Sequence, residues 1–132
     1  MKIALAGGGA FGEKHLDGLK NIDGVEVTAL VGRRLEPTQA MADKYGVGFA
    51  TTDYEAMLER DDVDAVILCT PTQMHADQAI KAMDAGKHVE VEIPLADSWA
   101  DAEAVLKKQE ETGLVCMAGH TRRFNPSHQF VK

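Results

Sequence analysis

One apolar run constrains the fold of this chain more than any other stretch, the segment DAVILCT at residues 64–70. A strand that is apolar on both faces occurs in parallel sheets that helices cover on both sides. Shorter runs predict five further strands, at residues 2–6, 25–31, 47–50, 88–93 and 114–119. Helical patterns separate the strands, at residues 11–20, 37–46, 52–59, 73–86 and 97–113. This alternation predicts an α/β fold with a doubly wound parallel sheet in the order 3-2-1-4-5-6.

The composition suits one soluble domain with a core of its own. The chain has 132 residues, of which 45% are hydrophobic and 27% are charged. Its net charge of −7 argues against nucleic acid and anionic membranes as partners. The apolar run at residues 2–6 is too short for a signal peptide, and no run has the length of a membrane span. We therefore expect a cytoplasmic protein.

The two cysteines are predicted to be structural. In this strand order, the strands that carry Cys69 and Cys116 flank a third strand, about 9.6 Å apart at about 4.8 Å per step. This distance is too long for a disulfide. We therefore expect both residues to act as small hydrophobic side chains of the core.

A glycine motif, Gly7-x-Gly9-x-x-Gly12, lies between the first predicted strand and the first predicted helix. That context is typical of the Rossmann dinucleotide-binding turn. Gly7 permits the tight turn, Gly9 lets a pyrophosphate approach the backbone, and Gly12 lets helix and strand pack closely. The N–H groups at Ala10 and Phe11 would face the phosphates. A glycine-rich turn without a ligand is the less favoured alternative, because six βα units surround the motif.

The end of the second strand indicates which cofactor binds. An acidic residue at this place would bind the ribose 2′-hydroxyl of NAD, but the sequence has Arg33 and Arg34. Guanidinium groups match the geometry of phosphates. The pair therefore favours the 2′-phosphate of NADP, with two solvated surface arginines as the alternative.

Further candidates follow the fourth strand, at the edge where open α/β sheets bind ligands. Thr70 and Thr72 can hydrogen-bond a cofactor, and Pro71 keeps the backbone between them out of a helix. His75 lies in the first turn of the next helix. Either a half-exposed helix histidine or a functional one fits this position.

Two glutamates lie on one face of the fifth strand, because they are two residues apart. Glu92, beside Pro94, is predicted to mark the edge of the cofactor cleft through contacts with ribose or the turn, and not to act as the general base. Glu90 is expected to be solvated or paired. The five histidines show no metal-ligand spacing, so no metal site is expected.

The segment GHTRRFNP leaves the sixth strand at the same edge. His120, Arg122 and Arg123 can meet an anionic ligand there, either the cofactor or a carboxylated substrate. A basic turn before a surface helix fits equally well. The sequence also lacks a Walker motif and a nucleophile elbow.

Four motifs in order, GGGAFGEKH, CTPTQMHADQA, GKHVEVEIPLA and GHTRRFNP, resemble the N-terminal half of the glucose-fructose oxidoreductase / inositol dehydrogenase / MocA (Gfo/Idh/MocA) family. The resemblance implies an NAD(P)-binding Rossmann domain, hydride transfer in a cleft closed by a C-terminal α+β domain, and a homo-oligomer at full length. The family's Glu-Lys-Pro motif reads Glu92-Ile93-Pro94 here. Its active-site lysine is therefore replaced by Ile93, which cannot relay a proton.

Within the family, the chain closely resembles bacterial NADP-dependent enzymes that oxidise a carboxylated muconate semialdehyde as its cyclic hemiacetal. The resemblance implies that hydride loss gives a lactone directly, without a cysteine acyl-enzyme. It also implies that Arg33 and Arg34 read NADP, and that Arg122 and Arg123 contact the cofactor or the carboxylates of the substrate. The catalytic residues stay unknown, and the base is expected beyond Lys132.

The expected organisation is an NADP-binding domain at residues 1–120 and the start of a connection at residues 121–132. The family's C-terminal substrate domain would lie outside this chain, which we expect to bind the cofactor without turnover. Three alternatives stay open. They are a stand-alone NADP-binding or sensing module, a domain that acts with a partner chain, and a sugar or polyol dehydrogenase of the same family.

Overall fold

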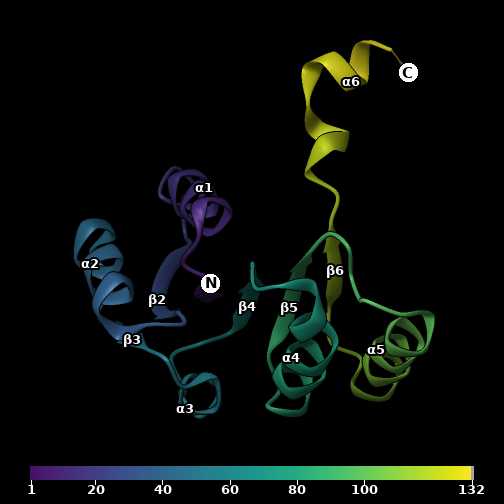
Figure 1. The fold of residues 1–132 in the computed structure, drawn as a ribbon, viewed down its shortest axis with the longest axis horizontal. Helices are drawn as coiled ribbons and strands as arrows, with labels where there is room; N and C mark the ends of the chain where they lie inside the picture. The colour runs from purple at the N-terminus through teal and green to yellow at the C-terminus, as the bar shows by residue number, and fades with distance from the viewer. Residues whose placement is uncertain (132) are drawn as a thin grey trace.

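The computed structural model describes residues 1–131. One parallel sheet has the order β3-β2-β1-β4-β5-β6, which confirms the predicted topology. Its strands are β1 (Lys2–Ala6), β2 (Glu26–Val31), β3 (Phe49–Thr51), β4 (Ala65–Leu68), β5 (His88–Glu92) and β6 (Cys116–Gly119). The helices are α1 (Ala10–Leu19), α2 (Leu35–Tyr45), α3 (Tyr54–Leu58), α4 (Thr72–Asp84), α5 (Trp99–Thr112), the 3-10 helix η1 (Thr121–Phe124) and α6 (Pro126–Phe130). Figure 1 shows α1 and α2 on one side of the sheet and α3, α4 and α5 on the other.

The helix ends follow their capping residues. Gly46 and Gly113 end α2 and α5 with φ angles of +71° and +66°, the left-handed backbone that glycine adopts without strain. Ser98 caps α5, since its hydroxyl accepts a hydrogen bond from the Asp101 N–H at 3.1 Å. The predicted start of the second helix at Pro37 is wrong by two residues, because α2 begins at Leu35.

The core forms two apolar layers, one on each face of the sheet. Because successive strand residues point to opposite faces, Ala4 and Val66 pack toward α3, α4 and α5. Leu5 and Ile67 point the other way and pack with Leu16 of α1. The sheet is therefore covered on both faces around β1 and β4, as its apolar sequence requires.

Helices α1 and α2 leave part of their face of the sheet open. In the strand register, Ile67 of β4 pairs with Glu90 of β5, and Glu90 pairs with Met117 of β6. The three side chains therefore lie on the same face. Ile67 belongs to the core beneath α1 and α2, whereas Met117 is exposed. Two carboxylates of β5, Glu90 and Glu92, thus lie at the border between the covered and the open half.

The two cysteines are free, as expected. Cys69 follows β4, Cys116 lies in β6, and β5 runs between these strands. Burial raises the pKa of the Cys69 thiol to about 12 and also raises the pKa of Cys116. Both thiols are therefore poor nucleophiles at neutral pH, which agrees with a structural role.

The C-terminal segment, residues 121–131, leaves the body of the domain after β6 (Figure 1). It contains η1 and α6, and its large apolar side chains Phe124, Phe130 and Val131 are exposed. None of the helices within residues 1–131 has the length and apolar character that a membrane span requires.

Candidate functional site

The glycine loop has the geometry that its sequence predicts. Gly7 has a φ of +108°, and a Cβ at this position would collide with the Cys69 carbonyl group. A Cβ at Gly12 would collide with the Gly7 carbonyl oxygen, so α1 approaches the loop more closely than any other residue would allow. Gly9 is the N-cap of α1, and a Cβ there would meet no protein atom within 4 Å. The side of the loop at Gly9 is therefore open, as a bound phosphate would need.

A cavity of about 620 Å³ lies over this loop at the carboxyl edge of the sheet. Its lining brings together six predicted residues: Gly7, Gly9, Arg33, Arg34, Thr70 and Pro71. Both arginines are exposed, and neither forms an ion pair within the part of the chain that the structure describes. Their guanidinium groups are therefore available to an anionic ligand.

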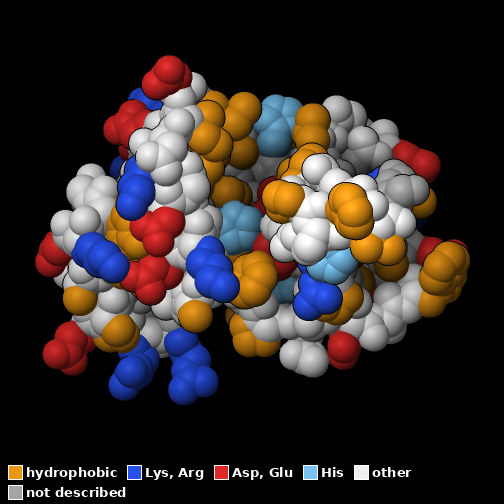
Figure 2. All heavy atoms as spheres, turned by 90° about the horizontal axis from the view of Figure 1, so that it is seen from above, with side chains coloured by type: hydrophobic (Ala, Val, Ile, Leu, Met, Phe, Trp, Pro, Cys, Tyr) orange, Lys and Arg blue, Asp and Glu red, His pale blue; other side chains and the backbone are white. Residues whose placement is uncertain are grey.

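A second cavity of about 420 Å³ continues along the same edge. The two cavities share Cys69, Thr70 and Pro71. The second cavity is also lined by the predicted residues Phe11, Thr72, His75, Glu92 and Ile93, with Thr121 and Arg122 from the C-terminal segment. Arg123 lines neither cavity. Figure 2 looks down on this edge and shows acidic and histidine side chains at the bottom of a hollow.

His75 is not the half-exposed helix residue that one interpretation of the sequence expects, because it is only 2% exposed. Its Nδ1 lies 2.8 Å from the Pro94 carbonyl oxygen, and its Nε2 lies 2.7 Å from the Thr70 carbonyl oxygen. The imidazole thus joins the loop after β4 to the loop after β5. The sequence gives no sign of this bridge, since Pro94 is 19 residues away along the chain.

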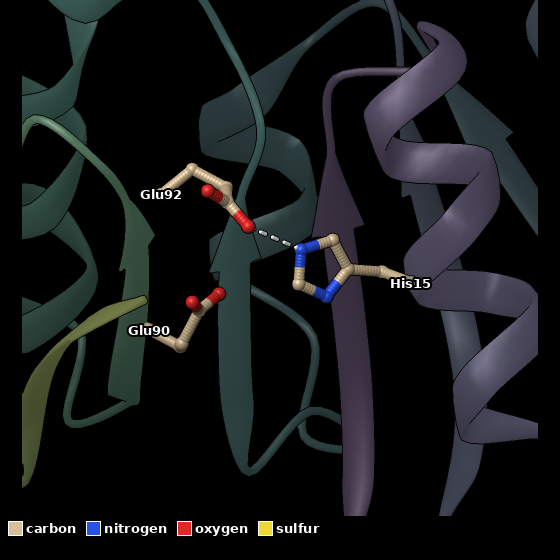
Figure 3. A group of neighbouring side chains, drawn as sticks. All are labelled: His15, Glu90 and Glu92. Atoms are coloured by element: carbon tan, nitrogen blue, oxygen red, sulfur yellow. Dashed lines mark hydrogen bonds and ion pairs between the residues drawn. The ribbon is translucent and has the colours of Figure 1, made fainter. Parts of the chain in front are cut away.

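Glu92 forms a partly buried pair with a residue that sequence reasoning missed. Its Oε1 lies 2.7 Å from Nε2 of His15 on α1 (Figure 3). Its Oε2 accepts a hydrogen bond from the Ile93 N–H at 3.3 Å. The two partners are 77 residues apart. The spacing in the sequence offers one indication. His15 follows Gly12 by three residues, so both lie on the side of the helix that faces the sheet.

Glu90 contradicts the expectation of a solvated or paired residue. Its Oε2 is buried and has no hydrogen-bond partner within residues 1–131. Burial raises the pKa of its carboxyl, and the nearby His15 opposes this effect. The side chain leans against Gly119 of β6, where a Cβ would collide with its Oε1. Only glycine on the neighbouring strand leaves room for this carboxylate.

Ile93 places an apolar side chain at the second cavity, and it is 40% exposed. Two of the polar residues that line this cavity with it, Glu92 and His75, are engaged in hydrogen bonds. Together the two cavities form one elongated trough. The first cavity contributes the end with the open glycine backbone and the two arginines, and the second contributes the end with the buried polar groups and Ile93.

A comparison with protein-family models matches residues 1–120 to an oxidoreductase family with an NAD-binding Rossmann fold, GFO_IDH_MocA. The chain belongs to this family. Gfo/Idh/MocA membership confirms the family resemblance and the fold class that the sequence predicts. It also identifies the trough as part of an NAD(P)-binding Rossmann domain of the kind found in this oxidoreductase family.

Individual relatives are informative too. The chain is 72% identical over 131 residues to a 4-carboxy-2-hydroxymuconate-6-semialdehyde dehydrogenase of Sphingobium sp. (strain NBRC 103272 / SYK-6), covering 99% of this chain and 42% of the relative. It is 32% identical over 133 residues to a scyllo-inositol 2-dehydrogenase (NAD(+)) of Bacillus subtilis (strain 168). That match covers 100% of this chain and 39% of the relative. The chain thus spans about two fifths of the length of these curated relatives.

Among solved structures, the Gfo/Idh/MocA chain is similar to a 3-ketoreductase from Actinomadura kijaniata in complex with NADP, with a TM-score of 0.91 and 32% identity. The match covers 99% of this chain and 42% of that structure. A probable dehydrogenase from Thermotoga maritima gives the same TM-score of 0.91 at 31% identity, and the match covers 95% of this chain and 38% of that structure. These relatives include an NAD(+)-dependent enzyme by name and a complex with NADP, so the family alone does not select between the two cofactors.

Proposed function

We propose that this chain is the NADP-binding domain of a dehydrogenase for 4-carboxy-2-hydroxymuconate-6-semialdehyde. The observation that carries the proposal is the 72% identity, over 131 residues, with a dehydrogenase of that name. The substrate would react as its cyclic hemiacetal and give 2-pyrone-4,6-dicarboxylate, a step of protocatechuate 4,5-cleavage catabolism. The chain alone would bind the cofactor without turnover.

The chemistry agrees with an apolar Ile93 at the cavity. The hemiacetal carbon already bears two oxygens, so its hydride can leave for the nicotinamide while the hydroxyl loses a proton, and a lactone forms directly. No acyl-enzyme is needed, in keeping with the raised thiol pKa values of Cys69 and Cys116. Ile93 cannot accept the hydroxyl proton, so a group other than the family's lysine must do so.

The preference for NADP rests on Arg33 and Arg34. Both line the cavity that contains the glycine loop, and the carboxylate that would bind the NAD ribose is absent from this turn. A 2′-phosphate placed there would meet two guanidinium groups. NADPH should therefore bind more tightly than NADH.

The first test is a calorimetric titration of the chain with NADPH and with NADH, followed in parallel by the fluorescence of Trp99. We expect NADPH to bind at least about 10-fold more tightly, since one charge-assisted phosphate contact contributes about 1.5–3 kcal/mol. Replacing Arg33 and Arg34 by alanine should remove most of this difference and leave NADH binding nearly unchanged.

The matched control is Lys107→Ala, which removes the exposed positive charge of an α5 residue that lines neither cavity. It should leave both affinities unchanged. If the double arginine variant loses NADPH and NADH binding equally, the arginines do not read the 2′-phosphate. If the folded chain binds neither cofactor, the proposal of an NADP-binding domain is wrong for this chain alone.

The substrate assignment needs a second experiment. Residues 1–120 can be joined to the remaining part of the 72% identical Sphingobium relative. The chimera should oxidise the semialdehyde with NADP⁺ and should not oxidise inositol, the substrate named for the relatives at 31–33% identity. If a folded chimera binds NADPH but does not oxidise the semialdehyde, the proposal that this domain serves a dehydrogenase for that substrate is wrong.

A further inference from the structure

We propose that His15, Glu90 and Glu92 form a binding site for one divalent transition-metal ion of the Zn²⁺ class. Each residue offers one ligand atom, and the three atoms lie within 4.8 Å of one another. Figure 3 shows the imidazole of His15 and the two carboxylates converging on one space between α1 and β5. The inference does not depend on the substrate or the cofactor proposed above.

The site is built on regular elements. Glu90 and Glu92 are two residues apart on β5 and therefore point to the same face of the sheet. His15 lies in the second turn of α1, which packs on that face through Leu16. Since a helix and a strand place all three donors, no loop has to close around the ion.

The donor set suits Zn²⁺ in kind and in number. One imidazole nitrogen and two carboxylate oxygens bind this ion at about 2.0–2.2 Å, which puts neighbouring donors about 3.3–3.6 Å apart in a tetrahedron. The closest pair, Nε2 of His15 and Oε1 of Glu92, is 2.7 Å apart. Small side-chain rotations that open this pair and draw in Glu90 would give the required spacing.

The charges of the cluster also favour a cation. Oε2 of Glu90 is buried without a hydrogen-bond donor, although a buried carboxylate normally has one. Within residues 1–131, no lysine or arginine forms an ion pair with Glu90 or Glu92. A divalent ion would satisfy the unpaired oxygen and offset the repulsion between the two carboxylates.

The position of the site connects it to the trough. Glu92 lines the second cavity, so an ion bound here would lie at the wall of that cavity. Three protein ligands leave one position of a tetrahedral ion for water or for an oxygen of a bound molecule. The site is therefore of the open type rather than the closed, four-ligand structural type.

The test is a titration of the metal-free chain with ZnCl₂ alone by calorimetry, and with CoCl₂ by visible absorption. We expect one ion per chain, and the absorption bands of four-coordinate Co²⁺. Glu90→Gln and His15→Gln should each weaken Zn²⁺ binding by more than about 10-fold, because each removes a ligand. The matched controls are Glu110→Gln and His128→Gln, both exposed and outside the cluster, which should bind Zn²⁺ like the unchanged chain.

One measurement does not require a variant to fold. In the unchanged chain, Zn²⁺ should shift the NMR signals of the His15 ring and leave those of His120 and His128 in place. Absence of Zn²⁺ binding by the folded chain would overturn the proposal, and so would binding that Glu90→Gln and His15→Gln leave unchanged. Because no nicotinamide cofactor is present in this titration, its result is independent of the NADPH experiment.

Discussion

At the scale of single residues, the glycine motif contains positions where the backbone of a neighbouring segment leaves no room for a Cβ. Gly12→Ala would drive a Cβ into the Gly7 carbonyl oxygen. Since backbone has to move, we expect a loss of about 1–3 kcal/mol in the free energy of unfolding, and weaker NADPH binding. The measurement is urea denaturation followed by circular dichroism.

The same helix provides the control. A Cβ at Gly18 in α1 would meet no atom within 4 Å, so Gly18→Ala should stabilise the domain by about 0.5–1 kcal/mol through helix propensity. If Gly12→Ala and Gly18→Ala destabilise the domain to the same extent, α1 would be sensitive to alanine at either glycine. In that case, the close approach at Gly12 would not be the cause.

Residue-level prediction from sequence succeeds where one residue has a local reason for its place. Gly12 is recognisable because its close contact is with the Gly7 carbonyl oxygen, which is nearby in the chain, and Gly7 is recognisable because its own backbone takes a positive φ in the turn. The pairing of His15 with Glu92, by contrast, depends on where α1 lies against β5 after folding. The burial of the Glu90 Oε2, where the sequence predicts a solvated or paired side chain, depends on the space that Gly119 leaves on the neighbouring strand.

At the scale of elements, the apolar runs and glycine caps predict all six strands and their order. This succeeds because strands buried on both faces are apolar throughout, as in β4. The ends are less predictable. The sequence predicts the third strand at residues 47–50, whereas β3 is Phe49–Thr51. This short strand lies at the edge of the sheet and pairs only with β2, so its bounds leave a weaker pattern in the sequence.

The bridge between two elements at His75 makes a prediction about stability. His75→Ala would remove the imidazole that lies within hydrogen-bond distance of the Thr70 and Pro94 carbonyl oxygens, and would open a cavity beneath the trough. We expect the free energy of unfolding to fall by about 2–4 kcal/mol and NADPH binding to weaken, because both loops line the cofactor cavities. Urea denaturation and calorimetry check the two effects, with the exposed His128→Ala as the control that should change neither. Unchanged stability would show that the bridge does not hold the loops.

At the scale of the whole molecule, the domain is a six-stranded sheet with one incompletely covered face. Helices α1 and α2 pack over β1, β2 and β4, while Met117 of β6 and the apolar residues of the C-terminal segment are exposed. The chain spans about two fifths of the length of its relatives, so their remaining residues have no counterpart in this sequence. The sequence predicts the boundary at residue 120 from the end of the last strand and from the family resemblance, and this boundary can be tested directly.

Removing residues 121–132 should leave the fold intact. Phe130 is 92% exposed, and Phe124 and Val131 are also exposed, so deletion removes little buried apolar surface. We expect the free energy of unfolding to change by less than about 1 kcal/mol in urea denaturation. The contrasting truncation ends at Gly113 and also removes β6, which pairs with β5 from Cys116 to Gly119. That chain should unfold at much lower urea concentration, because it loses a strand and exposes Val89 and Val91. If the shorter deletion destabilises the domain as much as the longer one, the segment after residue 120 belongs to the folded unit and the predicted boundary is wrong.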